Sequence, residues 1–299
     1  MTILHTALLT APPYTAEHKP QRGATRLFLQ QNRVQELVPT QEKLSQEDVP
    51  VKRNQPQEFV FNRSEKKYLI SSATASALLR LLGKDQFQDR RGSAFIRNLY
   101  LDTPDYKLIR RSIERPLYKE KLRVRTYGTI TGPEHEAFVE IKKKLKGRVF
   151  KRRFALTLEE VDDFIQGKTT PESQIARELA WSLQSYRPLQ PAISVCYERC
   201  AYTYPGADGN VRITIDCNLA AKIGSKSDLF APVDATAYQP LLPERRCVME
   251  IKIQCAIPLE LTRILSSLEI YPTSFSKVGT AYAQLFAHGI LSSDRGGPA

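Results

Sequence analysis

Apolar and polar residues alternate strictly along several segments in the middle of this chain. In segment 211–216, valine and isoleucine alternate with Arg212, Thr214 and Asp216. Successive side chains of a β-strand point to opposite faces, so this alternation predicts a strand with one apolar and one polar face. Alternation and strand-forming residues together predict strands over 59–69, 94–102, 118–127, 137–144, 148–156, 192–204, 210–217 and 246–254.

Helical spacing of apolar residues marks the segments between groups of strands. It predicts helices over 72–82, 105–113, 157–166, 172–186, 258–268 and 275–287. Thr157 and Glu160 form a capping box at the start of one helix, and Gly167 favours its end. Trp181 falls within another helix, where we expect it to join the core. This mixture of strands and helices indicates an α+β fold.

The polar faces of the predicted strands are strongly cationic. Lys121, Arg123 and Arg125 fall on one face of a single strand, and such same-face neighbours lie about 6–7 Å apart. Cations at that spacing repel each other unless an anion lies between them. One such strand is best explained as a solvated face, but the pattern recurs from strand to strand. We therefore expect a closed antiparallel β-barrel, flanked by helices, whose charged interior holds water, metal and a polyanion.

The composition agrees with an anionic ligand. The 299 residues carry a formal charge of +12, and a hydrophobic content of 41% supports a full core. An excess of cations points to nucleic acid, phosphorylated small molecules, polyphosphate or a membrane surface. No apolar run is long enough for a transmembrane segment, and the first residues lack the basic start of a signal peptide.

Composition also divides the chain into three parts. Proline and glutamine mark residues 1–56 as a flexible arm, residues 57–290 carry the strands and helices, and residues 291–299 form a disordered tail. The cysteines lack the spacing of a zinc site, and we expect them to be free thiols, which favours a cytoplasmic location. They are Cys196, Cys200, Cys217, Cys247 and Cys255.

The charged faces suit phosphate chemistry. Arginine contacts phosphate oxygens in bidentate fashion, and lysine supplies a point charge. Glu65, Glu140 and Glu250 each precede a lysine by two residues, and carboxylate oxygens suit Mn²⁺ or Mg²⁺. Phosphoryl transfer needs mainly positioning and charge neutralisation, without a protein nucleophile. The chain contains neither a Walker A loop nor a kinase-type glycine-rich loop.

A series of short motifs occurs in an order typical of one protein family. The motifs are Glu65-Lys-Lys-Tyr68, Tyr100-Leu-Asp-Thr103, Arg123-Val-Arg-Thr-Tyr-Gly128, Val139-Glu-Ile-Lys142, Lys151-Arg-Arg-Phe154, Tyr197-Glu-Arg199, Arg212-Ile-Thr-Ile-Asp216, Met249-Glu-Ile-Lys252 and Phe275-Ser-Lys277. Together they resemble the VTC domain, the polyphosphate polymerase module of the vacuolar transporter chaperone complex, which belongs to the triphosphate tunnel metalloenzymes. The chain is similar to the stand-alone bacterial form, without the SPX domain and membrane helices of the eukaryotic complex.

The resemblance implies a closed tunnel in which the γ-phosphate of ATP passes to a growing polyphosphate chain, with a divalent metal, and ADP leaves. It implies that the catalytic cations are Arg123, Arg125, Lys142, Lys151, Arg199 and Arg212. Further phosphate contacts are expected from Lys67, Arg153, Lys252 and Lys277, of which the last lies at the tunnel mouth. The metal ligands are expected to be Glu250, Glu140 and Glu65.

Two other functions stay open on the sequence alone. A hydrolase of inorganic or organic triphosphate would use the same tunnel, with water in place of phosphate as the attacking group. A non-catalytic binder of polyanions or nucleic acid is disfavoured, because glutamates weaken a basic groove and few aromatic residues lie on the basic faces for stacking. Asp216 fits an ion pair as well as a metal ligand, and Asp102 fits a turn cap better than a metal ligand.

Overall fold

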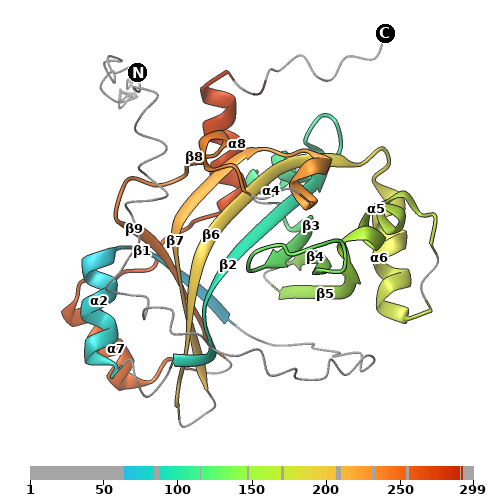
Figure 1. The fold of residues 1–299 in the computed structure, drawn as a ribbon. Helices are drawn as coiled ribbons and strands as arrows, with labels where there is room; N and C mark the ends of the chain where they lie inside the picture. Colours follow the sequence, from blue (N-terminus) through green and yellow to red (C-terminus); the bar gives the residue numbers. More distant parts are fainter. Residues whose placement is uncertain are drawn as a thin grey trace, which may run out of the picture.

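One antiparallel sheet organises the fold (Figure 1). The computed structural model describes residues 64–83, 88–114, 116–146, 148–169, 172–206, 210–230, 233–253, 256–289 and 291. Within these ranges the fold is α+β, with a nine-stranded sheet and six α-helices. The predicted arm, residues 292–299 of the tail and residues 59–63 of the first predicted strand lie outside the described ranges.

The elements follow the sequence-based predictions closely. The strands are β1 (Ser64–Ser71), β2 (Gln88–Asp102), β3 (Tyr118–Tyr127), β4 (Glu136–Leu145), β5 (Arg148–Thr157), β6 (Gln190–Tyr204), β7 (Val211–Ile223), β8 (Gln239–Pro240) and β9 (Arg246–Ile253). The α-helices are α2 (Ser72–Leu81), α4 (Lys107–Ile113), α5 (Leu158–Gln166), α6 (Gln174–Ser185), α7 (Leu259–Ser267) and α8 (Lys277–Ala287). No described helix combines the length and the apolar character that crossing a membrane requires.

The sheet bends so that its charged face lies on the inside. Its strand order is β1-β9-β7-β6-β2-β3-β4-β5, with β8 beside β7. β1 and β4 stand near opposite ends of this order, yet Lys142 Nζ on β4 lies 3.5 Å from Glu65 Oε2 on β1. This contact is possible because the sheet curves strongly, as Figure 1 shows. The face that carries these two side chains is therefore the inner face.

The closed barrel expected from the sequence is not formed by backbone hydrogen bonds. β1 and β5 are the two edges of the sheet, and no ladder joins them among the described residues. The outer edge of β1 instead pairs locally with the segment before α8, where the Thr273 N–H donates to the Lys67 carbonyl at 2.7 Å. Closure depends on the tilt and stagger of all strands together, so the alternation within each strand does not determine it.

The outer face of the sheet is apolar and packs under two pairs of helices, as expected. One core lies between β1, β7, β9 and the helices α2 and α7; its buried residues include Tyr68, Leu78, Ile213, Met249, Ile251 and Leu261. A second core lies between β3, β4 and the helices α5 and α6; it includes Leu122, Val124, Val139, Val161, Phe164 and Leu179. Burial of these apolar side chains fixes which face of each strand turns inward.

A third core fills one end of the inner face. Val278 and Ala281 of α8 and Ile109 of α4 pack in one cluster with Tyr197 and Val248 of the sheet. By strand alternation Tyr197 shares a face with Arg199, and Val248 with Glu250. α4 and α8 thus cover the apolar part of the inner face and leave its charged part as a separate space.

Local capping explains where several helices begin and end. The Thr157 backbone N–H donates to the Glu160 carboxylate at 2.9 Å before α5, and Gly167 ends that helix with φ of 71°. Asp102 accepts hydrogen bonds from the backbone N–H groups of Leu108 and Ile109 at 2.8 Å. Asp102 is therefore a cap for α4, as the sequence favoured.

Two expectations from the sequence are wrong. Trp181 is 67% exposed, because the buried stripe of α6 runs through Ala176, Leu179 and Leu183 on the opposite side of the helix. The cysteines are not all free, since Cys217 and Cys247 form a disulfide. Asp216 of β7 pairs with Val248 of β9, so the two cysteines are adjacent across those strands, a proximity that spacing along the chain does not reveal.

Candidate functional site

The charged part of the inner face brings together every candidate site residue of the sequence analysis. Strand register aligns them in cross-strand rows: Arg123 of β3 faces Glu140 of β4, and Glu140 faces Arg153 of β5. On the other side, Glu250 of β9 faces Lys67 of β1. We call this set of residues on the inner face the charged chamber. It contains Glu65, Lys67, Arg123, Arg125, Glu140, Lys142, Lys151, Arg153, Arg199, Arg212, Asp216, Glu250 and Lys252 from strands, and Lys277 from α8.

Glu140 organises one side of the charged chamber. Its side chain is 1% exposed, and Oε2 accepts from Arg123 Nε at 2.7 Å and lies 2.6 Å from Arg123 Nη2. Oε1 lies 2.8 Å from Lys151 Nζ and 3.5 Å from Arg153 Nε. Burial by itself would raise the pKa of Glu140, but Arg123, Arg125 and Lys151 hold it well below its usual value. Glu140 is therefore an anion that fixes cations from two neighbouring strands.

Asp216 and Glu250 organise the opposite side. Asp216 accepts two hydrogen bonds from Arg199, from Nε at 2.6 Å and from Nη2 at 2.7 Å. Lys277 Nζ lies 2.7 Å from Asp216 Oδ2 and 3.1 Å from Glu250 Oε1. Despite its burial, the pKa of Lys277 is raised by these two carboxylates. Asp216, whose role the sequence left open, is thus held in ion pairs.

Lysines of β1, β9 and β4 contact the remaining carboxylate oxygens of the charged chamber. Lys252 Nζ donates to Glu250 Oε2 at 3.1 Å, and Lys67 Nζ lies 4.0 Å from Glu250 Oε1. Lys67 also donates to the Phe275 carbonyl at 2.9 Å, which ties β1 to the segment that leads into α8. Glu65 lies 3.6 Å from Lys67 Nζ and 3.5 Å from Lys142 Nζ. This last pair spans the space between the edges of the sheet.

Arg125 and Arg212 occupy different depths. Arg125 is buried, and its Nε donates to Asn98 Oδ1 at 2.8 Å while Nη1 donates to the Tyr127 hydroxyl at 3.3 Å. Arg212 is exposed and faces Lys252 across the β7–β9 ladder. The structure thus places Arg125 in the wall and Arg212 at an outer end of the charged chamber.

Lys121 is a chamber residue that the sequence analysis left out of the site. Register places it directly opposite Lys142 of β4, which in turn faces Lys151 of β5. Like charges directly opposite each other destabilise a sheet. Burial, together with Lys67, Lys142, Lys119 and Arg123, lowers the pKa of Lys121 to about 7. The sequence showed that Lys121 shares a strand face with Arg123. It did not show the neighbours from distant segments that help to lower the pKa of Lys121.

We expect tripolyphosphate affinity to fall as pH rises above about 7, because the amines of Lys121 and Lys151, each with a pKa of about 7, then lose their protons. Anion binding favours the protonated amine, so at higher pH each of these lysines must take up a proton when the complex forms, and each costs at most about tenfold in affinity per pH unit. Lys121→Arg should flatten this dependence, since arginine stays charged. Calorimetric titration of both proteins across pH measures the difference, and identical slopes would exclude Lys121 as a titrating group.

The carboxylates of the charged chamber could hold a divalent metal only singly or in pairs. Among the described residues, no group of three or more histidine, cysteine, aspartate or glutamate side chains lies close enough together to hold a metal ion. Both Glu140 and Glu250 have cations at both oxygens, but Glu140 is held by Arg123 at 2.6 Å, whereas Glu250 contacts only lysine amines, at 3.1–4.0 Å. Mg²⁺ is commonly held by one or two carboxylates plus substrate phosphates. Glu250, with Glu65 across the β1–β9 ladder, fits that mode, in which the metal would neutralise phosphate oxygens.

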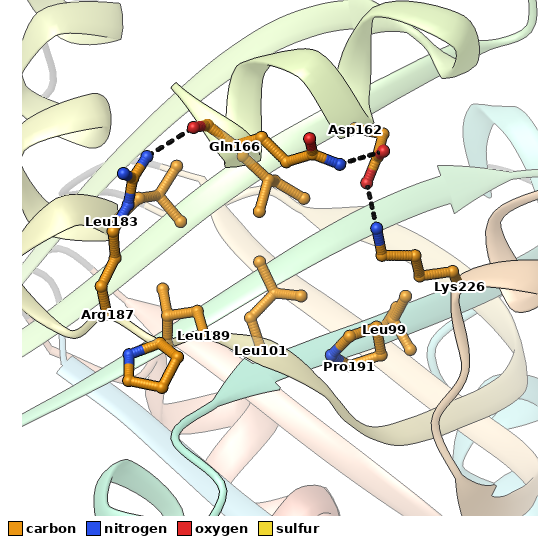
Figure 2. A pocket seen from close by; sticks show the side chains of 11 residues that line it. Leu99, Leu101, Asp162, Gln166, Leu183, Arg187, Leu189, Pro191 and Lys226 are labelled. Atoms are coloured by element: carbon orange, nitrogen blue, oxygen red, sulfur yellow. Dashed lines mark hydrogen bonds and ion pairs between the residues drawn. The ribbon is translucent and has the colours of Figure 1, made fainter. Parts of the chain in front are cut away.

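A separate cavity lies on the outer side of the sheet. It has a volume of about 250 Å³ and is lined by Leu99 and Leu101 of β2 together with residues of α5, α6 and the start of β6. Figure 2 shows its apolar walls and the Lys226–Asp162 ion pair at its edge, with a distance of 3.2 Å between Nζ and Oδ1. Leu99 and Leu101 point away from the charged chamber because their neighbours Asn98 and Tyr100 face it. The cavity is therefore not part of the candidate site.

Comparison with solved structures gives distant fold likenesses. A "putative adenylate cyclase" from Bacillus halodurans has a TM-score of 0.40 and 14% identity, and covers 72% of this chain and 96% of that chain. A "putative adenylate cyclase" from Vibrio parahaemolyticus has a TM-score of 0.38 and 11% identity, covering 74% and 97%. The Schizosaccharomyces pombe Mediator head module has a TM-score of 0.32 and 12% identity, covering 75% and 94%. At such scores these likenesses add nothing to the assignment of the chain.

Comparison with protein families is decisive. No curated protein matches the chain. The sequence model of the VTC domain matches residues 62–286, which is more than half of the chain. These residues contain every strand and nearly the whole of every helix described above, together with the complete charged chamber. The chain belongs to the VTC domain family.

Proposed function

We propose that this protein is a polyphosphate polymerase that transfers the γ-phosphate of ATP to a growing polyphosphate chain and releases ADP. The observation that supports this most strongly is the arrangement of cations around buried carboxylates. Arg123, Arg199 and Lys277 are each held by Glu140 or Asp216 within 2.6–2.7 Å. Positive charge fixed before the substrate arrives stabilises a phosphoryl-transfer transition state without reorganisation.

The proposed step needs no covalent intermediate with the protein. A terminal oxygen of the polyphosphate chain attacks the γ-phosphorus of ATP, and the bond from that phosphorus to the β–γ bridging oxygen breaks. Arg123 and Arg125 lie on one wall and Arg199 and Lys277 on the other, so phosphates between them contact cations on both sides. ADP carries the negative charge of the broken bond away. A divalent cation held by Glu250 would neutralise phosphate oxygens.

Product analysis tests the proposal directly. Purified protein is incubated with ATP and Mn²⁺, and the products are resolved by gel and by assay of free phosphate and ADP. We expect long polyphosphate with one ADP for each phosphate added. Free phosphate or pyrophosphate without polymer would indicate a triphosphate hydrolase instead of a polymerase. Tight binding of tripolyphosphate with no turnover would leave a polyanion-binding protein.

The assignment of Glu250 to the metal is tested in the same assay. Glu250→Gln keeps the size of the side chain and removes its charge, so we expect the Mn²⁺ concentration at half-maximal activity to rise. Glu244→Gln, at an exposed position outside the charged chamber, serves as the matched control. An unchanged Mn²⁺ titration in Glu250→Gln would show that Glu250 does not bind the metal.

A further inference from the structure

A group of exposed cations continues from the charged chamber to the tip of the β4–β5 hairpin. Along β4 the inner-face residues become steadily more exposed: the side chain of Glu140 is 1% exposed, that of Lys142 is 39% exposed, and Lys144 is exposed at the end of the strand. Lys146 and Arg148 follow, and both are exposed. We call Lys144, Lys146 and Arg148 the hairpin-tip cations. Lys144 extends the positive inner face of β4 out of the charged chamber, and Lys146 follows in the turn. Arg148 pairs with Leu145 across the hairpin, so it lies on the other face of the same tip.

The hairpin-tip cations differ from the chamber cations in their partners. In the charged chamber, Lys142, Lys151 and Lys277 each lie within 3.5 Å of a carboxylate oxygen. In the described part of the chain, the side chains of the hairpin-tip cations have no carboxylate within ion-pair distance. The neighbouring Lys119 is different again, because its Nζ donates to the Ser112 carbonyl at 3.1 Å. The tip therefore combines like charges that no carboxylate of the described ranges compensates.

The spacing of these cations suits a linear polyanion. Lys142 and Lys144 lie on the same face of a strand, roughly 6–7 Å apart along it. Lys144 faces Lys119 of β3 on one side and Val149 of β5 on the other, so acidic side chains do not flank it in the ladder. Polyphosphate carries negative charge at every repeat unit, so a chain that leaves the charged chamber along the inner face of β4 meets Lys142 and Lys144 before it reaches Lys146 at the turn.

The packing at the other end of the charged chamber also favours an exit for the polymer over the β4–β5 hairpin. α8 and α4 cover the apolar part of the inner face on the β6, β7 and β9 side. Lys121 Nζ donates to Ser276 Oγ at 3.0 Å at the border of this cover. β4 and β5 lie beyond that border, where Lys142 and Lys151 are partly exposed to solvent. A long chain can therefore pass over the β4–β5 hairpin without displacing a packed helix.

We propose that the hairpin-tip cations form an outer binding track for the part of a polyphosphate chain that extends beyond the charged chamber. This inference rests on the proposed function for the identity of the polymer. It gives the protein a selectivity for chain length: a tripolyphosphate fits within the charged chamber, whereas a long chain also gains the contacts on the hairpin. The track holds the product between additions and keeps its end near the chamber.

Length-dependent binding tests the track. The test variant is K144Q/K146N/R148Q in the full chain, with asparagine at Lys146 because that residue has a positive φ of 46°. The matched control, R80Q/R177Q/R263Q, removes the same charge from exposed positions on α2, α6 and α7. Binding of tripolyphosphate and of long-chain polyphosphate is measured by calorimetry over a range of salt concentrations. Circular dichroism confirms that both variants are folded.

We expect the test variant to bind long-chain polyphosphate roughly tenfold more weakly than the control, with a salt slope reduced by about 2. Its affinity for tripolyphosphate should match that of the control. Equal weakening for both ligands, or none for either, would overturn the track. Unchanged polyphosphate binding with lost binding to phosphatidylserine vesicles would overturn it in favour of a membrane contact.

The outcome separates this inference from the proposed function. If the wild-type protein makes no polymer but the test variant loses its preference for long chains, the track stands and the polymerase proposal fails. If the wild-type protein makes polymer and both variants bind long chains equally, the polymerase stands and the track fails.

Discussion

Arg123→Ala should lower the rate of phosphoryl transfer by a factor of about 10²–10³, the loss usual when one fixed donor to a developing charge is removed. Glu140 holds Nε and Nη2 of Arg123 at 2.7 and 2.6 Å. Nη1 lies 3.4 Å from the Tyr100 hydroxyl at the wall of the charged chamber. The guanidinium is therefore oriented before a phosphate arrives, and its positive charge is available at no cost of reorganisation.

The control for this prediction separates chemistry from folding. Alanine at 123 leaves Glu140 with Lys151 and Arg153 as partners, so we expect the protein to stay folded. Arg123→Lys keeps the charge but loses the fork of donors, and its rate should fall between the wild type and Arg123→Ala. Arg80→Ala, on the outer helix α2, should behave as the wild type. Loss of cooperative unfolding in Arg123→Ala would show that the residue is mainly structural.

Asp216→Ala should lower the free energy of unfolding by about 3–5 kcal/mol, because it leaves buried cations without their anion. The side chain of Asp216 is fully buried, while the side chains of its partners Arg199 and Lys277 are 15% and 10% exposed. Tripolyphosphate can replace the missing negative charge. It should therefore raise the melting temperature of the variant by more than that of the wild type. Denaturant and thermal unfolding with and without ligand measure both effects.

The pH dependence gives a second readout of the same pair. Burial alone would raise the pKa of Asp216, but Lys277 and Arg199 lower it below its usual value. A carboxyl whose pKa is lowered by folding stabilises the protein above its unfolded pKa of about 3.9, and this contribution is lost as pH falls towards the folded pKa. Asp216→Ala should therefore lose stability less steeply in acid than the wild type. Glu244→Ala is the exposed control, and equal acid slopes in all three proteins would contradict the assignment.

The strands and their two faces were predictable because side-chain alternation is a local property of each strand. The charged face of β3 and the apolar core beneath β7 both follow from a few consecutive residues. The predicted chamber residues therefore face one space. Helix ends at Gly167 and Asp102 were equally local, because a cap depends on residues within one or two turns.

The partners within the charged chamber were decided by the tertiary structure. Glu140 meets Arg123 and Lys151, and Asp216 meets Arg199 and Lys277, only because register brings distant strands together. Lys121 became a site residue for the same reason, since its lowered pKa comes from burial in the folded protein and then from Lys67 and Lys142 on other strands. The Cys217–Cys247 disulfide likewise depends on the pairing of β7 with β9.

The sequence by itself therefore determined the family resemblance, the α+β class and the charged inner faces, because these depend on residue order and short-range geometry. The tertiary structure decided that the sheet is open between β1 and β5, which side chains bridge that opening, and which carboxylates hold which cations. Those features depend on the summed tilt, stagger and curvature of all the strands, and no single segment of the chain contains that information.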